Sequence, residues 1–306
     1  MSRSTISAYE LNRRFPHPEA ARKYMEEKRW GGTPVCPACA STALYTLSRT
    51  GFYRCQTCRL DFTVRTRTIM ERSHIPLDKW LYTFYLVMTA RKGISSLQLA
   101  KEIGVTQKSA WFLLQRIREA CGNGISELLE GIVEADETYI GGKESNKHET
   151  KKLKAGRGTV GKKPVLGVRE RGGRVTGIVL PSTNKAMIQA VVGAVVAPGA
   201  MLCTDEHAAY VGMDQFSHEV VNHSAKEFVN GMAHTNGIES VWAVLKRGFY
   251  GVYHSFSGKH LQRYVDEFSF RLNEGNVKNH TMVRIDSLLE KTVGVRITYK
   301  ELTEKV

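Results

Sequence analysis

Two C-x2-C pairs lie near the front of this chain and constrain its fold more than any other feature. They are Cys36 with Cys39 and Cys55 with Cys58, and fifteen residues separate the pairs. Four thiolates satisfy a tetrahedral Zn²⁺, and a two-residue spacing lets both sulfurs of one turn reach the same ion. The residues at 42–48 and 51–55 suit the strands of a zinc ribbon. Two disulfides or a redox C-x-x-C motif are the alternatives, but two matched pairs at ribbon spacing favour structural zinc.

The residue after each pair departs from the usual ribbon pattern. Such turns commonly carry glycine there, because glycine adopts a positive φ without strain. Ala40 and Arg59 occupy these positions instead. The geometry of the two turns is therefore open, while the set of four ligands is unaffected.

The balance of charge is the first indication of a partner. Forty-four Lys and Arg against 30 Asp and Glu give a net charge of +14 and a pI near 9.5. Each phosphate that a basic protein neutralises releases counterions and strengthens binding, so this excess favours a nucleic acid. An ordinary basic protein without a polyanionic partner is the alternative reading of charge alone.

Hydropathy argues against a membrane protein. The chain has no run of about 18 apolar residues, and its first fifteen residues lack the apolar core of a signal peptide. We expect a cytoplasmic, nucleoid-associated protein without a membrane partner. Cysteines in that compartment are reduced thiols or metal ligands, which agrees with the zinc interpretation.

The residues after the cysteines predict a helical DNA-binding region. A buried helix is expected over 78–91, followed by a pair of shorter helices. Ser95 or Ser96 can cap the first of the pair, Gly104 breaks it, and Thr106 can cap the second. Two short helices joined by a glycine-containing turn are the outline of a helix-turn-helix.

The second helix of that pair would present its first residues to DNA. Recognition helices usually contact base edges through their N-terminal residues, which here include Gln107 and Lys108. A three-helix bundle that only packs, without contacting DNA, is the alternative.

The residue pattern changes near residue 131, where runs of β-forming residues begin. Three strands, then alternating helices and strands, and finally two long helices predict a mixed α/β fold with helices covering the sheet. Residues 143–163 carry eight Lys and Arg and almost no large apolar side chain. This segment reads as a basic insertion between strands, either a solvated loop or an arm that contacts DNA through Lys151 and Lys152.

Three regions follow from these patterns. We expect an N-terminal helix and zinc ribbon at 1–70, a helix-turn-helix domain at 71–128, and an α/β domain at 129–306.

Three acids in the α/β region are candidates for a catalytic metal site. Asp136 lies inside an apolar strand, Asp205 ends a second one, and Glu239 follows on a helix. Carboxylates in such places are costly to bury without a partner, and hard oxygen ligands suit Mg²⁺ or Mn²⁺. Three carboxylates can hold two metal ions for phosphoryl transfer. Alternatively, the three are a sheet-edge acid, a helix cap and a surface residue.

Three strings in this region carry a resemblance to a known family. Starting at residues 133, 204 and 234, they read VEADETYIGGK, TDEHAAY and HTNGIESVWAVLKRGFYGVYHSFSGKHLQRYVDEFSFRLN. They resemble the DDE-type insertion-sequence transposases that begin with a zinc ribbon and carry an ISXO-like transposase domain, a group related to the Merlin elements. The resemblance extends from about residue 15 to 275.

The resemblance implies an RNase H-like catalytic core with Mg²⁺-dependent cleavage at transposon ends and strand transfer into target DNA. By position, Asp136 and Asp205 match the two strand aspartates, and Glu239 matches the helix glutamate. Lys246 matches a basic residue that holds the DNA, with Arg247 beside it and Asn236 on the same helix as a further candidate DNA contact. In part of the group the third acidic position is asparagine, so Asn236 is the rival of Glu239. We favour Glu239, because a carboxylate can neutralise Mg²⁺ and an amide cannot.

The resemblance also implies the partners. These are double-stranded DNA, as terminal inverted repeats and as target, and at least one further copy of the chain, giving a homodimer or higher assembly on DNA. A non-catalytic DNA-binding regulator or a domesticated transposase is the alternative function, although a binder has no need of the complete set of acids.

Overall fold

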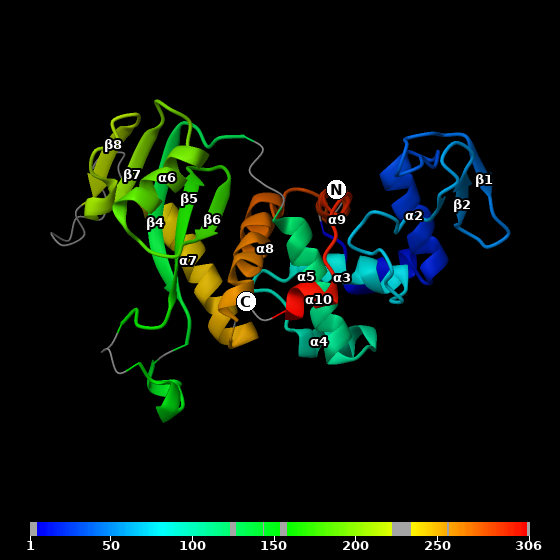
Figure 1. Cartoon of the computed structure of the whole chain (residues 1–306), viewed down its shortest axis with the longest axis horizontal. Coiled ribbons are helices and arrows are strands. Elements are labelled where there is room, and N and C mark those ends of the chain that lie inside the picture. The colour runs from blue at the N-terminus through cyan, green and yellow to red at the C-terminus, as the bar shows by residue number, and fades with distance from the viewer. Residues whose placement is uncertain are drawn as a thin grey trace. The chain divides into compact units, whose positions relative to one another are not determined.

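The computed structural model describes residues 5–122, 127–142, 144–153, 158–221, 234–255 and 257–304. The chain divides into two units (Figure 1). Unit 1 comprises Met1–Asn123 together with Glu274–Val306, and unit 2 comprises Gly124–Asn273. Within the described ranges, no helix is long and apolar enough to cross a membrane.

Unit 1 begins with two helices and a small sheet. The elements are α1 (Ala8–Arg14), α2 (Pro18–Trp30), β1 (Leu44–Thr46), β2 (Tyr53–Cys55) and β3 (Asp61–Phe62). The three strands form an antiparallel sheet in the order β1-β2-β3, with both C-x2-C turns beside it. The expected N-terminal helix is present as α2, with Pro18 in its first turn and the His17 side chain accepting a hydrogen bond from the Ala20 N–H.

The two cysteine turns are equivalent despite their lack of glycine. Ala40 and Arg59 both adopt a left-handed backbone, with φ of 59° and 61°. The Ala40 N–H donates to the Cys36 carbonyl at 2.9 Å, and the Arg59 N–H donates to the Cys55 carbonyl at 3.1 Å. The turns therefore keep the ribbon geometry, and the two side chains add the strain that a Cβ brings to this backbone.

Relieving that strain should tighten zinc binding. We expect Ala40→Gly to raise the apparent zinc affinity about two- to fivefold, because ribbon folding is coupled to metal binding. The substitution removes left-handed strain of about 1–2 kcal/mol, and the entropy cost of glycine, about 0.5–1 kcal/mol, offsets part of that gain. Competition with a chromophoric chelator measures the change. Ala38→Gly is the control, since Ala38 is not among the positive-φ residues and should only lose affinity. Equal losses in both variants would contradict the strain argument.

The rest of unit 1 is helical. Its elements are α3 (Leu77–Thr89), α4 (Ser96–Ile103), α5 (Gln107–Cys121), α9 (Thr281–Lys291) and α10 (Tyr299–Thr303). The two helices and the turn expected for a helix-turn-helix are present as α4 and α5. Ser95 caps α4 by accepting from the Gln98 N–H, Gly104 ends it at φ 61°, and Thr106 caps α5. Ser95, rather than Ser96, is the capping residue.

The last residues of the chain pack with the N-terminal unit. Glu274–Val306 belongs to unit 1, whereas the sequence pattern predicts one domain over 129–306. Helix α9 packs on α3 and α2. Its Asp286 accepts a hydrogen bond from the Tyr24 hydroxyl and pairs with Lys28 at 2.7 Å. An amphipathic pattern gives the apolar face of a helix but not the body on which that face packs, which explains the difference.

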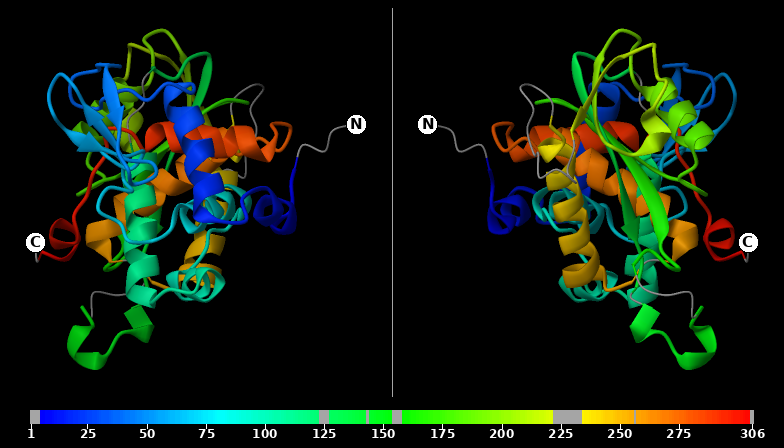
Figure 2. Two further views of the ribbon diagram at one scale, coloured as in Figure 1. Left: turned by 90° about the vertical axis from the view of Figure 1, so that its right-hand side faces the viewer. Right: turned by 90° about the vertical axis from the view of Figure 1, so that its left-hand side faces the viewer.

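Unit 2 is built on a mixed five-stranded sheet in the order β6-β5-β4-β7-β8 (Figure 1, Figure 2). The strands are β4 (Ile132–Ile140), β5 (Lys163–Glu170), β6 (Val175–Val179), β7 (Met201–Asp205) and β8 (Ser217–Val221). The first three pair antiparallel, and β7 and β8 continue in parallel from β4. This is the mixed α/β fold that the residue pattern predicts.

Helices cover both faces of this sheet. They are α6 (Lys185–Val195), α7 (Asn236–Gly248) and α8 (Leu261–Glu274). Short turns complete the unit as η1 (Glu144–Asn146), η2 (Glu149–Lys151), η3 (Ala208–Tyr210), the π-helical segment η5 (Phe249–Tyr253) and η6 (Gly258–His260). One apolar cluster joins α6 to the inner strands, and a second joins α7 and α8 to β4, β5 and β6.

Two strand glycines allow the helices to approach the sheet closely. A Cβ at Gly167 would lie 2.4 Å from the ring of Trp242, and one at Gly177 would lie 2.5 Å from Val265. Gly167 lies opposite Asp136 in the register of β4 and β5. The glycine therefore makes room for a large ring of α7 directly beside the first candidate acid.

Candidate active site

Asp136 and Asp205 come together because their strands are parallel neighbours. The register pairs Ile132 with Met201 and Glu134 with Cys203, so two residues further on Asp136 faces Asp205. Carboxylate oxygens of Asp136, Glu137 and Asp205 all lie within 4.8 Å of one another. Three acids at the edge of a sheet are a donor set that suits a divalent cation.

Glu137 was not among the acids singled out from the sequence. Alternation along a strand places it on the opposite face from Asp136, so the pattern gives no reason to group the two. The paired register of β4 with β7 ends at Glu134, and β4 runs on beyond it. There Glu137 accepts a hydrogen bond from the buried Tyr210 hydroxyl at 2.6 Å. The adjacent Asp-Glu pair was the only signal available.

Trp242 ties helix α7 to the acid cluster. Its indole N–H donates to Asp136 Oδ2 at 2.8 Å, and the side chain is almost fully buried. This hydrogen bond orients the Asp136 carboxylate and fixes the side of α7 that faces the cluster.

Burial and repulsion between like charges raise the pKa values of two acids in the cluster. The pKa of Asp136 is raised to about 7, first by burial and then by repulsion from Glu137, while the Trp242 hydrogen bond partly opposes this. Burial likewise raises the pKa of Glu137, against the hydrogen bond from Tyr210. A bound cation would relieve both effects, since it favours the charged carboxylates.

This electrostatic arrangement predicts a pH-dependent stability. The pKa of Asp136 is about 7 in the folded chain and near 4 in the unfolded chain. Between these two pH values the carboxyl is protonated only in the folded state. In zinc-loaded protein without Mg²⁺, stability should therefore fall as pH rises from about 4 to about 7, by up to about 4 kcal/mol. Unfolding midpoints across this range measure the effect. Asp136→Asn should flatten the profile, and an unchanged slope in that variant would contradict the assignment.

The third acidic position lies on the first turn of α7. Glu239 is exposed, and its carboxylate is not part of the three-acid group. Its Oε1 accepts a hydrogen bond from the Thr235 hydroxyl at 3.1 Å. Glu239 lies three residues before Trp242 and so shares its side of the helix. Asn236 lies six residues before Trp242 and is also exposed.

The basic candidates occupy separate places in the two units. Lys246 and Arg247 are exposed in the last turn of α7. Lys152 pairs with Glu149 at 2.7 Å, and the side chain of Lys151 lies outside the described residues.

At the start of α5, both expected DNA contacts are exposed but already have neighbours. The Gln107 amide donates to Ser96 Oγ at 2.8 Å, and the Lys108 ammonium lies 4.7 Å from the centre of the Tyr299 ring. Tyr299 belongs to α10, so the end of the chain contributes to the surface around Lys108.

The four cysteines form a cluster that fits zinc. Their sulfurs all lie within 4.8 Å of one another, and Cys36–Cys58 and Cys39–Cys55 are each 3.5 Å apart. A tetrahedral ion with Zn–S bonds of about 2.3 Å needs sulfurs about 3.8 Å apart. The cysteines are free thiols, so the disulfide alternative is not what the fold presents.

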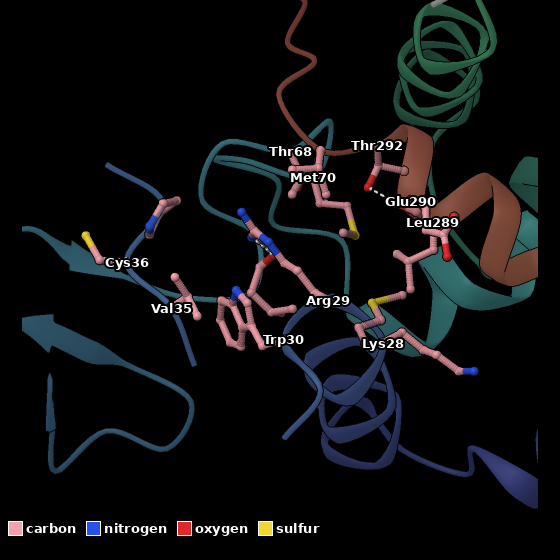
Figure 3. Close-up of a pocket in the computed structure, with 14 residues that line it drawn as sticks. Lys28, Arg29, Trp30, Val35, Cys36, Thr68, Met70, Leu289, Glu290 and Thr292 are labelled. Atoms are coloured by element: carbon pink, nitrogen blue, oxygen red, sulfur yellow. Dashed lines mark hydrogen bonds between the residues drawn. The ribbon is translucent and has the colours of Figure 1, made fainter. Parts of the chain in front are cut away.

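A pocket of about 320 Å³ in unit 1 lies beside the cysteine cluster, since Cys36 is one of its lining residues (Figure 3). Its lining is mostly apolar and includes Trp30, Met70 and Leu289. Arg29 lines it with a guanidinium that donates to the Val64 carbonyl at 2.7 Å. None of the carboxylates of the acid cluster reaches this pocket, so it is not the candidate active site.

Comparison with known proteins identifies two domains. Residues 128–273 match the model of the ISXO2-like transposase domain, and residues 16–61 match the model of the transposase zinc-ribbon domain. A protein of transposable element ISH50 from Halobacterium salinarum is 29% identical over 275 residues, covering 84% of this chain and 91% of that protein.

Solved structures of Mos1 transposase overlap more loosely. A pre-cleavage transpososome and a strand transfer complex have a TM-score of 0.30, with 13% and 14% identity. The overlap covers 69% of this chain and 76% and 75% of the two Mos1 chains. The assignment of domains stands on the two family matches and not on these structures. This chain carries a transposase zinc-ribbon domain at 16–61 and an ISXO2-like DDE transposase domain at 128–273.

Proposed function

We propose that this chain is an active DNA transposase that cleaves at the ends of its element and transfers the freed 3′ ends into target DNA. The observation that carries the proposal is the meeting of Asp136, Glu137 and Asp205 at one edge of the sheet. The ISXO2-like DDE transposase domain, whose family consists of phosphoryl-transfer enzymes, supports it. A DNA binder without catalysis gains nothing from three acids held close together, because their repulsion only costs stability.

Asp136, Asp205 and Glu239 are the residues that would hold Mg²⁺ or Mn²⁺. When bound, such ions activate the attacking oxygen and stabilise the leaving oxygen of a phosphoryl transfer. Trp242 holds the Asp136 carboxylate in one orientation through its indole N–H. Glu239 is favoured over Asn236 because it shares the Trp242 side of α7 and carries the charge that the ions require.

The remaining contacts are assigned to DNA. Lys246 and Arg247, at the far end of α7, would hold phosphates near the acids. Gln107 and Lys108 would read base edges from the start of α5, and Lys151 and Lys152 would contact the backbone from the basic insertion.

Zinc and further copies of the chain complete the proposal. Zn²⁺ held by the four cysteines would stabilise the ribbon and take no part in the chemistry. Two copies or more would pair the terminal inverted repeats before joining them to double-stranded target DNA.

A strand-transfer assay tests this function. Purified, zinc-loaded protein should join a pre-cleaved end of its own element to a target plasmid in Mg²⁺. A duplex of scrambled sequence and a reaction without divalent metal are the controls, and neither should give joined product. Binding without joining would support a regulator, and cleavage of any duplex without preference for the end would support a general nuclease.

A further inference from the structure

The start of helix α7 is held in an unusual way. The first N–H groups of a helix need acceptors, and the N-cap side chain normally supplies one. At α7 the N-cap is Thr235, and its side chain makes no capping hydrogen bond. The hydroxyl donates instead to Glu239 Oε1 at 3.1 Å. Another group must therefore cap the helix.

That group is Glu134, which reaches α7 from strand β4. Its Oε2 accepts a hydrogen bond from the Ile238 N–H at 2.9 Å, and only 1% of the residue is exposed. A carboxylate at this place also meets the positive end of the helix dipole. Gly237 makes the approach possible, because a Cβ there would lie 2.5 Å from Glu134 Oε2.

Two arginines, one in β5 and one just after its end, secure the same junction. Arg171 donates to Glu134 Oε1 at 3.1 Å and to the His234 carbonyl at 3.1 Å. Arg169 donates to the Gly237 carbonyl and to Ser240 Oγ. The buried carboxylate thus has a charged partner, which offsets the cost of burying it.

Glu134 also differs from the acids of the active site. It lies two residues before Asp136 on the same strand and so faces the same side of the sheet. Its carboxylate, however, is not in the group formed by Asp136, Glu137 and Asp205. Its hydrogen bonds go to the helix start and to Arg171, so a role in holding metal does not fit its contacts.

We propose that Glu134 is a positioning residue that caps α7 from the sheet and thereby frees the Thr235 hydroxyl to orient the Glu239 carboxylate. Strand β4 then supplies both Asp136 and the cap that fixes the helix carrying Glu239. This inference rests on the proposed function, since it concerns the third acid of that site.

The test separates positioning from simple stability. Thr235→Val removes the hydroxyl and keeps the shape, whereas Thr235→Ser keeps the hydroxyl. Hydrogen bonds to charged groups correspond to about a ten- to hundredfold effect. We expect Thr235→Val to lower the strand-transfer rate by about that factor and to weaken Mn²⁺ binding measured by calorimetry on zinc-loaded protein. Thr235→Ser should restore both to near the wild-type values.

Glu134→Gln and Gly237→Ala test the cap itself. The first removes the charge, and the second places a methyl group against the Glu134 carboxylate without changing any charge. Both should weaken Mn²⁺ binding and strand transfer, while binding of the transposon end without metal stays within about twofold. Gly251→Ala is the matched control, because a Cβ at Gly251 would meet no described atom within 4 Å, and it should leave all three readouts near wild type.

Three outcomes overturn the inference. The first is Thr235→Val with wild-type Mn²⁺ affinity and strand transfer. The second is Thr235→Ser as defective as Thr235→Val. The third is a parallel loss of end binding, metal binding and melting temperature in the cap variants, which would mean a structural role alone. If wild-type protein joins no ends, the proposed function fails instead, and Mn²⁺ binding still reports on the cap.

Discussion

Asp205→Asn is expected to abolish strand transfer while leaving the fold intact. Asparagine keeps the size of the side chain and can still accept the hydrogen bond that Asp205 Oδ1 receives from the His207 N–H at 3.0 Å. What it loses is the negative charge that would balance a divalent ion between β4 and β7. Metal-ion catalysis contributes several kcal/mol of transition-state stabilisation, so the joining rate should fall at least about a thousandfold.

The same substitution at Asp214 is the matched control. Asp214 is exposed, lies nine residues further along in the same unit, and is not in the acid cluster. Asp214→Asn should join ends at the wild-type rate, and both variants should bind the transposon end like wild type. Neither should melt below the wild type, since loss of the Asp205 charge relieves repulsion in the acid cluster. Joining by Asp205→Asn within tenfold of wild type would show that the assigned site is not the active site.

The two strand aspartates were predictable from the sequence because a simple physical rule selects them. An acid that interrupts or ends an apolar strand needs a partner, and Asp136 and Asp205 satisfy that rule. The sheet then brings them together, since β4 and β7 are parallel neighbours with matching register. The order of elements also predicted the mixed sheet, because the change from strands to alternating helices and strands is visible in the residue pattern.

Side-chain contacts between distant elements could not be predicted in this way. Glu134 and Glu137 flank the first aspartate, and nothing local separates a helix cap from a member of the acid cluster. Glu134 is recognised only by its contact with α7, which lies about a hundred residues later. Glu137 is recognised only by the closeness of its carboxylate to Asp136 and Asp205 and by its bond to Tyr210. Both depend on how the helices and the loop after β7 pack on the sheet.

The sequence also does not show which elements pack against the strand glycines and the last helices. Glycine within a strand indicates a close approach, but the sequence does not say that Trp242 approaches Gly167. No helix α9 is predicted from the residue pattern, and the packing of this helix on α3 and α2 is visible only in the fold. Local patterns thus give elements and candidate acids, whereas domain boundaries and supporting contacts require the fold.

Cys55→Ser is expected to have the second large effect, because the ribbon has little besides zinc to hold it. Cys36, Cys55 and Phe62 form its buried core, with only a few partly buried side chains around them. Structural zinc contributes about 10–16 kcal/mol of apparent binding free energy in comparable small domains, far more than three strands of two or three residues can supply. Loss of one buried thiolate should therefore remove the ion and unfold the ribbon.

Three measurements test whether Cys55→Ser loses zinc and unfolds the ribbon alone. Metal analysis should give one zinc per wild-type chain and none in the variant, and limited proteolysis should cut between residues 31 and 62 only in the variant. Mn²⁺ binding should persist, since the acids of unit 2 do not depend on the ribbon fold. Cys121→Ser is the control, because Cys121 lies at the end of α5 outside the four-cysteine cluster and should keep its zinc.

Binding of the transposon end by Cys55→Ser then decides what the ribbon is for. If the ribbon contributes to DNA recognition, affinity for the specific end should fall by at least about tenfold, while affinity for unrelated duplex changes little because the basic surface remains. Unchanged end affinity with lost zinc would limit the ribbon to supporting unit 1. Full retention of zinc by Cys55→Ser would contradict the ligand set itself, since a hydroxyl cannot replace a thiolate in this site.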